Sequence, residues 1–316
     1  METRPYRSGD EQAIIDLFYL TFRKPLLLEE WNWRYRNNPL GDLFIYLMWD
    51  GTKLVGHYAV SPVRMKLGST IVKTALSLDT MTHPDYVGRG IFTSLAEATY
   101  HELVRRDYAA VWGFPNTSSH YGFRKNLAWK DLSLIPMLVL KLDQCRMPDQ
   151  NTASIIDVEQ FDSRFDQLEL EIASTLPCSV IRDARFLNWR FKANPSHQYK
   201  IIAFENAHQI LAYAVMKLYK SPESLFVDLV DLLATPSTIS VILSAVIQYA
   251  RSQKAFGINT WMNVNHPFYL DLEKSGFEPA TPVTYWGVRS LRESTPDSRL
   301  YDYRSWYLTM GDSDVY

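Results

Sequence analysis

The chain has 316 residues, of which 47% are hydrophobic and 22% charged, and its formal net charge is −2. This length suits two domains of ordinary size, each with its own core. A near-neutral chain without a run of Lys or Arg lacks the charge pattern of proteins that bind nucleic acids or anionic membranes. There is no signal-peptide pattern and no segment long and apolar enough to span a membrane, so we expect a cytoplasmic protein.

The cysteine content argues against a disulfide framework. Cys145 and Cys178 are the two cysteines, and they lack the spacing of a zinc site. No cluster of His, Cys and carboxylate residues has metal-ligand spacing either. We therefore expect reduced thiols and no metal.

In chain order, apolar spacing predicts an α/β protein with a mixed (α+β) sheet. Ser8 and Glu11 have the spacing of a capping box for the first helix, which Pro25 ends. The first half then reads as a helix at 31–38, strands at 43–49, 53–66 and 71–82, a helix at 92–103, a strand at 108–114, a short helix from 115 and a strand at 132–142. The second half reads as helices at 162–173 and 182–194, strands to 234, a helix at 236–252, a strand at 257–262 and a terminal pair of strands.

The two halves are related by an internal repeat. Residues 32–39 (NWRYRNNP) return as residues 188–195 (NWRFKANP), a shift of 156 (188 − 32). A shift that then decreases along the chain is what loop deletions produce in a duplicated domain. Three further segments correspond at smaller shifts: 54–60 with 210–215, 78–84 with 230–236, and 128–129 with 276–277.

The repeat predicts two domains, residues 1–145 and 154–316. A polar, proline-containing stretch at 143–153 has neither the helix nor the strand period and is typical of a linker. Trp33 and Trp189 occur in both copies, so we interpret them as core anchors. Arg34 and Arg190 are expected to pair with a nearby carboxylate or helix end.

Only the first half carries a glycine loop. After Pro84 the sequence DYVGRGIF places Gly88 and Gly90 between a strand and a helix, whereas STISVI follows the matching Pro236. Amides at a helix start have no intrahelical partner, and glycines let them approach an anion closely. We therefore predict that residues 88–93 bind a pyrophosphate, with Arg89 adding a charge-assisted contact. One half would be active and the other supporting.

This strand, loop and helix resemble the acyl-CoA loop of the GNAT acyltransferase superfamily. In that family the loop follows the fourth strand, usually after a proline, with the pattern Arg/Gln-x-x-Gly-x-Gly/Ala. Pro84 and Gly90 fit the pattern, whereas Val87 replaces the usual Arg or Gln and Phe92 replaces the second Gly or Ala. The resemblance covers both halves in element order and the loop in one, so it implies two tandem GNAT-like domains, the second degenerate and expected to complete the acceptor site.

The resemblance also implies acyl-CoA as co-substrate and direct attack of an amine on its thioester, without a metal. Strand residues 80–82 would line the pantetheine and thioester, and Asn116 would bond the pantetheine arm. The expected cofactor-binding residues are Thr80, Met81, Thr82, Val87, Gly88, Arg89, Gly90, Ile91, Phe92, Thr93 and Asn116.

The candidates for the general base are Asp79, His83, His120 and His57, of which we favour His120 and Asp79 jointly. A carboxylate among apolar neighbours on the fourth strand is suited to accept a proton near neutrality, and so is an imidazole beside the thioester. Asp231 matches Asp79 in the half without the loop, so a shared structural hydrogen bond is the alternative. Tyr121 is the acid that the resemblance implies, and Tyr269 matches it, which leaves a packing role open.

Three further residues are expected to face the substrate: His57 on the third strand, His83 beside the loop, which it also braces, and Ser119. The segment Gly311–Asp314 is interpreted either as a frayed tail or as an acidic pair that folds over the site and holds a substrate ammonium.

The segment 113–119 and its continuation to Trp129 resemble tandem enzymes that acylate nucleotide-linked amino sugars for surface polysaccharides. We therefore expect an N-acyltransferase that acts on the primary amine of such a sugar (for example one linked to dTDP), as a monomer or homodimer. One alternative is acetylation of an aminoglycoside or other small amine. Another is a CoA-binding protein without catalysis.

Overall fold

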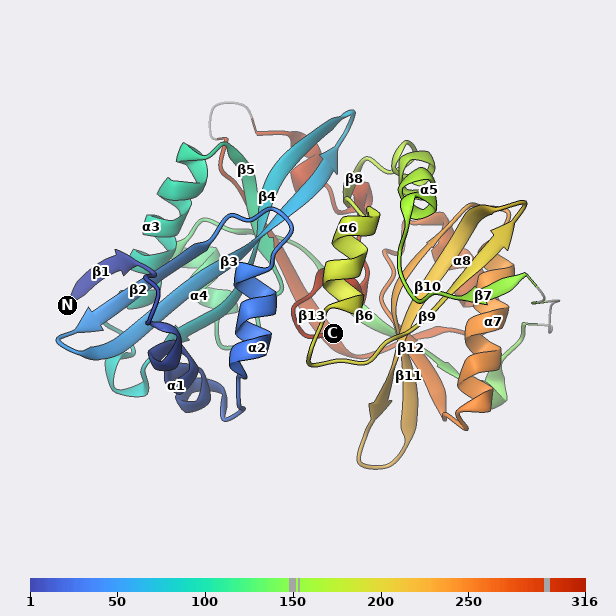
Figure 1. Cartoon of the computed structure of the whole chain (residues 1–316), viewed down its shortest axis with the longest axis horizontal. Coiled ribbons are helices and arrows are strands. Elements are labelled where there is room, and N and C mark those ends of the chain that lie inside the picture. Colours follow the sequence, from blue (N-terminus) through green and yellow to red (C-terminus); the bar gives the residue numbers. More distant parts are fainter. Residues whose placement is uncertain (148–151, 153, 293–295) are drawn as a thin grey trace. The chain divides into compact units, whose positions relative to one another are not determined.

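The computed structural model describes residues 1–147, 152, 154–292 and 296–316 (Figure 1). They form two compact units that are not consecutive in sequence. Unit 1 comprises Met1–Met65, Ile71–Ser133 and Tyr285–Tyr301, and unit 2 comprises Lys66–Thr70, Leu134–Thr284 and Asp302–Tyr316.

Two strands account for this interleaving. Strand β13 (Glu278–Ser290) pairs with β5 (Tyr108–Gly113) of unit 1, and β6 (Lys130–Lys141) pairs with β12 (Gly257–Thr260) of unit 2. The sequence-based ranges 1–145 and 154–316 differ from the units at residues 66–70, 134–145 and 285–301. Of the predicted linker, residues 148–151 and 153 lie outside the described residues.

Unit 1 is a mixed sheet with helices on both faces. Its strand order is β1-β2-β3-β4-β5-β13, in which β4 and β5 are parallel. Its remaining elements are β1 (Glu2–Pro5), α1 (Glu11–Phe22), α2 (Leu28–Trp31), the π-helix η1 (Asn32–Arg36), β2 (Phe44–Asp50), β3 (Lys53–Leu67), β4 (Thr70–Thr82), the 3-10 helix η2 (Pro84–Tyr86), α3 (Ile91–Arg105) and α4 (His120–Asn126).

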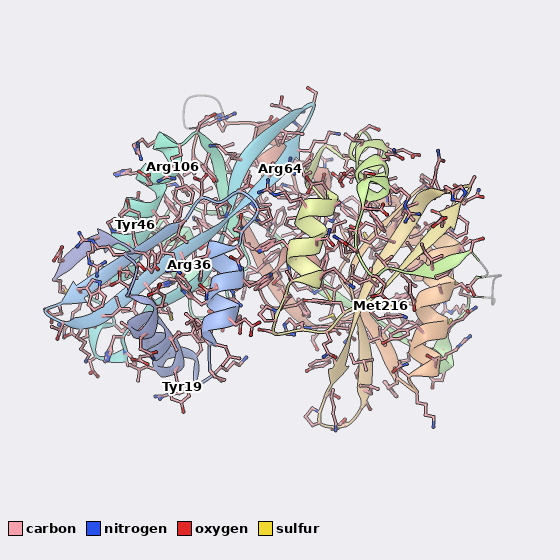
Figure 2. The ribbon with its side chains drawn as sticks, viewed as in Figure 1. Tyr19, Arg36, Tyr46, Arg64, Arg106 and Met216 are labelled. Carbon is pink, nitrogen blue, oxygen red and sulfur yellow. The ribbon has the colours of Figure 1, made fainter. Side chains whose placement is uncertain are left out.

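Neighbouring residues of β3 show how the two faces are covered. Tyr58 packs edge-on against Tyr100 of α3, with ring centroids 5.9 Å apart. His57 points to the opposite face, where its ring meets that of Tyr35 in η1 edge-on, with ring centroids 6.4 Å apart. On that face Arg36, labelled in Figure 2, forms an ion pair with Glu11 of α1. The core of α3, α4 and the sheet thus lies on one side, and α1, α2 and η1 lie on the other.

Unit 2 repeats this order of elements. Its sheet runs β6-β12-β11-β10-β9-β7. Met216, labelled in Figure 2, lies on β10 where the register with β11 shifts. Its remaining elements are β7 (Ile155–Asp157), α5 (Ser163–Ala173), β8 (Cys178–Val180), α6 (Ala184–Leu187), the π-helix η4 (Asn188–Lys192), β9 (Lys200–Asn206), β10 (Gln209–Lys220), β11 (Leu225–Ala234), α7 (Ile239–Ser252), α8 (Pro267–Ser275) and β14 (Trp306–Tyr307).

The repeated octapeptide adopts the same rare conformation in both units. The Asn37 amide donates to the Asn32 carbonyl and the Ala193 amide to the Asn188 carbonyl, each at 2.9 Å and five residues apart. Single π-turns of this kind are uncommon in helices and are often found at functional sites. The sequence repeat therefore corresponds to a repeat in local structure.

Several local predictions were wrong. Ser8 does not cap α1; Asp10 is at the N-cap, and its side chain instead binds Arg4 and the Arg7 amide. The short helix expected from 115 begins at His120. The short strands β1, β7 and β8 and the helix α8 were not predicted, and the expected terminal pair is one long strand, β13, and the two-residue β14. Such short strands are set by their pairing partners, because they offer too few residues for an alternating pattern.

No helix in the described part of the chain is long and apolar enough to cross a membrane.

Candidate functional site

The candidate site lies where β4 extends past its parallel neighbour. The last registered pair of β4 and β5 is Leu76 with Trp112, and β5 ends at Gly113, whereas β4 continues to Thr82. The six residues 77–82 therefore present strand backbone beyond the paired part. Backbone groups at such an edge need partners, and an extended ligand can supply them.

Asp79 occupies a backbone bulge in this part of β4. Its φ of +47° is uncommon for a residue with a side chain and costs on the order of 1–3 kcal/mol. Three groups hold it there. Nη1 of Arg34 lies 2.8 Å from both carboxylate oxygens, the Tyr35 hydroxyl donates to Oδ2 at 2.6 Å, and His57 Nδ1 binds the Asp79 carbonyl at 2.7 Å. The expected proton acceptor is thus an ion-paired carboxylate that anchors the bulge.

His57 is fully buried behind this bulge. Burial lowers the pKa of its imidazole, against the opposing effect of Asp79, so the neutral form is favoured. A neutral ring that donates from Nδ1 to a carbonyl keeps its lone pair on Nε2. Among the described residues Nε2 has no hydrogen-bond partner. The expectation that His57 faces the substrate stays a prediction; its side chain is buried.

The glycine loop joins β4 to α3. His83 fixes its start, because its amide donates to the Val55 carbonyl at 2.9 Å and its Nδ1 accepts from the Asp85 amide at 3.2 Å. Gly88 and Gly90 have φ of +80° and +76°, conformations that glycine adopts without steric cost. A Cβ on either glycine would meet nothing within 4 Å. The loop therefore needs both glycines for its conformation, and it borders open space.

Helix α3 begins at Ile91, directly after its N-cap residue Gly90. Its first backbone bond runs from the Ser94 amide to the Gly90 carbonyl at 3.0 Å, so the amides of residues 91–93 precede the intrahelical ladder. Together with the helix dipole, they favour an anion at this end. Arg89 instead folds back over the Tyr86 ring, 4.6 Å from its centroid, and donates to the Asp85 carbonyl.

The start of α3 is packed tightly against β3 and α4. A Cβ at Gly56 would lie only 2.3 Å from Cγ2 of Ile91, so β3 must carry glycine there. Phe92, the residue that departs from the family pattern, packs against Phe123 at 5.0 Å between ring centroids. Gly122 leaves room for the Phe92 ring, because a Cβ there would be 3.1 Å from it. The bulky residue is thus accommodated on the core side of the helix.

The residues predicted from α4 face in different directions. Asn116 Oδ1 accepts from the amides of Ser118 and Ser119 at 3.0 Å each, so this side chain shapes the turn before the helix. The Ser119 hydroxyl also binds that oxygen. Tyr121 is 63% exposed and its hydroxyl accepts from Lys125 at 2.6 Å.

His120 is held by two residues that sequence reasoning missed. Its Nε2 lies 2.9 Å from Oδ1 of Asp131, and its ring stacks on Tyr285 with centroids 4.1 Å apart. Tyr285 returns to unit 1 from the far end of the chain, and no spacing rule links it to His120. No contact joins His120 to Asp79 in the described part of the chain, so the two predicted bases are not brought together.

Unit 2 builds a different environment at the position that matches Asp79. Asp231 is fully buried and binds Arg182 at 3.1 Å, the Tyr213 hydroxyl at 2.8 Å and the Thr309 hydroxyl at 2.7 Å. Arg190, which matches Arg34, donates instead to carbonyls of the C-terminal segment.

That segment is neither a frayed tail nor a free acidic pair. Asp312 is buried and forms an ion pair with Arg182 at 2.8 Å, so its carboxylate is not available to a substrate ammonium. Trp33 is buried as expected for a core anchor, whereas Trp189 is only half-buried.

No metal site is evident, since the described residues contain no group of three His, Cys, Asp or Glu side chains placed to hold an ion.

Comparisons with known proteins bear on the family of the first part of the chain and on the fold. Residues 2–130 match the model of the acetyltransferase (GNAT) domain family. No curated protein matches the chain in sequence.

Three solved structures are similar over 92% of this chain. They are a GCN5-related N-acetyltransferase from Anabaena variabilis ATCC 29413 (TM-score 0.74, 13% identity, 73% of that chain), a conserved protein described as a probable N-acyltransferase from Enterococcus faecalis V583 (0.72, 13%, 72%), and a GCN5-related N-acetyltransferase from Kribbella flavida (0.69, 14%, 71%). At these identities the likeness establishes the fold, which is GNAT-like.

Proposed function

We propose that this chain is a CoA-dependent N-acyltransferase whose catalytic unit is unit 1. The observation that carries the proposal is the loop before α3. Gly88 and Gly90 have a left-handed backbone, and the amides that follow them precede the first hydrogen bond of α3. Both features lie in the part of the chain that matches the acetyltransferase domain. Backbone amides and the helix dipole suit a pyrophosphate, and the extended edge of β4 at Thr80, Met81 and Thr82 suits the pantetheine arm.

In the proposed reaction the acceptor amine attacks the thioester carbonyl, the C–S bond breaks, and the amine loses a proton to a base. Tyr121 protonates the departing thiolate. Backbone amides of β4 stabilise the carbonyl oxygen. His120, oriented by Asp131, and Asp79 remain the two bases to be compared. The ion pair with Arg34 favours an anchoring role for Asp79, whereas Nδ1 of His120 is the nitrogen that does not face Asp131.

The proposed acceptor is the primary amine of a nucleotide-linked amino sugar. This rests on the resemblance of residues 113–129 to sugar-acylating tandem enzymes. An aminoglycoside-like amine is the second acceptor class, because Glu30 and Asp79 share the single cation Arg34, which leaves this cluster with a net negative charge. The two classes differ in charge, so acceptor panels separate them.

Calorimetric titration with CoA and acetyl-CoA tests the loop directly. Gly90→Glu places an anion and a strained side chain where the pyrophosphate would bind, so affinity should fall by roughly 100-fold or more. The matched control is Ser237→Glu, an exposed residue of the corresponding turn in unit 2, which should leave affinity unchanged. Equal affinity in wild type and Gly90→Glu would remove the CoA assignment.

Release of free thiol with a panel of amines tests catalysis and the base. We expect Tyr121→Phe and the true base variant, His120→Gln or Asp79→Asn, each to lower kcat by roughly 10²–10⁴-fold with intact CoA binding. A role limited to anchoring predicts that Asp79→Asn changes stability more than kcat. CoA binding without thiol release from any amine would leave a binding protein without catalysis.

A further inference from the structure

The C-terminal segment 303–313 follows a path through unit 2 that matches the candidate site of unit 1. It contacts the residues after β12, the end of β11 and the π-helix η4. By the internal repeat these correspond to the residues after β5, the end of β4 and η1. Each contact involves groups that have counterparts in unit 1.

The path begins just beyond the end of β12. This strand ends at Thr260, which pairs with Leu229, whereas β11 continues to Ala234. Asn263 is 2% exposed, and its Nδ2 donates to the carbonyls of Tyr303 at 2.7 Å and Trp306 at 2.9 Å. A buried amide thus holds the backbone of a 3-10 turn (Tyr303–Ser305) and of the residue after it, at the place where Asn116 is expected to hold a pantetheine arm in unit 1.

The middle of the segment crosses the free end of β11. The Tyr307 hydroxyl donates to the Leu232 carbonyl, and the Thr309 hydroxyl donates to Asp231 at 2.7 Å. At the shift of 152 that relates Pro236 to Pro84, Leu232 and Asp231 match Thr80 and Asp79. The segment therefore supplies partners to the strand groups that a substrate would meet in unit 1.

The segment then closes against η4 without spare room. A Cβ on Gly311 would lie 3.0 Å from the Phe191 ring and 3.3 Å from Cβ of Asp231. Arg190 donates to the carbonyls of Gly311 at 3.1 Å and Ser313 at 2.8 Å. Arg34, the matching arginine of unit 1, turns onto Asp79 instead.

The turn before α7 closes as well. Thr235 and Thr238 are buried, and their hydroxyls bind each other at 3.0 Å. The Thr238 hydroxyl also donates to the Leu211 carbonyl at 3.0 Å. Threonine hydroxyls thus close the turn that corresponds to the glycine loop of unit 1.

We infer that residues 303–313 are an internal occupant, which takes in unit 2 the position that in unit 1 is left to the substrates. Unit 2 then binds neither CoA nor an acceptor, and the chain has one CoA site. This inference rests on the proposed function for its choice of ligand. Its structural part, a stably seated segment, stands independently.

Two measurements on the full chain test it. Calorimetry should give one CoA per chain, and Gly90→Glu should remove that single site. Hydrogen exchange followed by residue should show slow exchange at 308–313 without ligand. Saturating CoA should slow exchange at residues 87–93 and leave 308–313 unchanged. Tyr307→Phe, which removes only the hydroxyl bond to Leu232, should speed exchange of the segment about fivefold and keep one CoA per chain.

The outcomes separate the two proposals. No CoA binding, together with slow exchange of 308–313, removes the proposed function and keeps the internal occupant. Two CoA molecules per chain, one site surviving in Gly90→Glu, or faster exchange of 308–313 on adding CoA overturns the inference. Fast exchange of the segment in the free protein overturns it without reference to CoA.

Discussion

The connection from β4 to α3 and the matching connection from β11 to α7 begin in the same way and end differently. In each, the amide of the residue before the proline donates to a carbonyl of the preceding strand at 2.9 Å: His83 to Val55, and Thr235 to Leu211. From there the chain takes eight residues to reach Ile91 (91 − 83) but only four to reach Ile239 (239 − 235). In the longer connection residues 87–90 are exposed. In the shorter one the hydroxyls of Thr235 and Thr238 hydrogen-bond to each other, and that of Thr238 also donates to the Leu211 carbonyl.

The two central carboxylates differ in the same sense. Asp79 sits in a strained bulge beside a partly exposed arginine, whereas Asp231 is fully buried between Arg182, Tyr213 and Thr309. One copy of the fold keeps strain and open amides, which a ligand can use, and the other satisfies its polar groups internally.

The largest expected difference concerns the two arginines. Arg182→Gln leaves Asp231 and Asp312 buried without a cation, so it should cost about 3–5 kcal/mol of unfolding free energy. Arg34→Gln should cost about 1–2 kcal/mol, because Arg34 and Glu30 keep contact with solvent. Urea unfolding of both variants measures this. Similar losses would mean that the two carboxylate sites are energetically alike.

A smaller effect is expected where the loop helix meets β3. Gly56→Ala puts a Cβ against Ile91 and should destabilise unit 1 by about 1–3 kcal/mol while weakening CoA binding. At the shift of 156 the matching residue of unit 2 is already alanine, and Ala212→Gly should cost only about 0.5–1 kcal/mol. Thermal unfolding and CoA titration check both variants. A stable Gly56→Ala with normal affinity would show that this close approach does not position α3.

The last expected effect, of similar size, is a pH dependence confined to unit 2. Burial raises the pKa of Glu169 to about 7. Because the folded pKa lies above the ordinary value near 4.5, the stabilisation by the bound proton is fully present below about pH 4.5 and is lost as pH rises through about 7. Between pH 5 and pH 8 the unfolding free energy of Glu169→Gln should therefore rise by about 1–3 kcal/mol relative to that of wild type, because the wild type loses this stabilisation and the variant does not.

The control for this prediction is Glu171→Gln, an exposed residue of the same helix. Urea unfolding at pH 5 and pH 8 should show no such gain for it. A pH profile of Glu169→Gln parallel to that of wild type would mean that Glu169 does not titrate in this range.

The sequence by itself determined the features that depend on neighbouring residues. The alternating apolar pattern placed most long strands and α3. The glycines of the loop were readable because a left-handed backbone selects glycine locally. The octapeptide repeat was readable as a repeat, and Asn32–Arg36 and Asn188–Lys192 each form a π-helix.

The tertiary structure alone decided the features that join distant parts of the chain. Equivalent arginines, Arg34 and Arg190, have different partners, because carbonyls of the C-terminal segment lie against Arg190 whereas Asp79 lies against Arg34. His120 meets Asp131 and Tyr285 because β13 returns to unit 1, a pairing that no local period encodes. The different partners of Asp79 and Asp231 are set by such long-range packing, since a side chain's environment depends on all the elements around it and not on its own sequence neighbours.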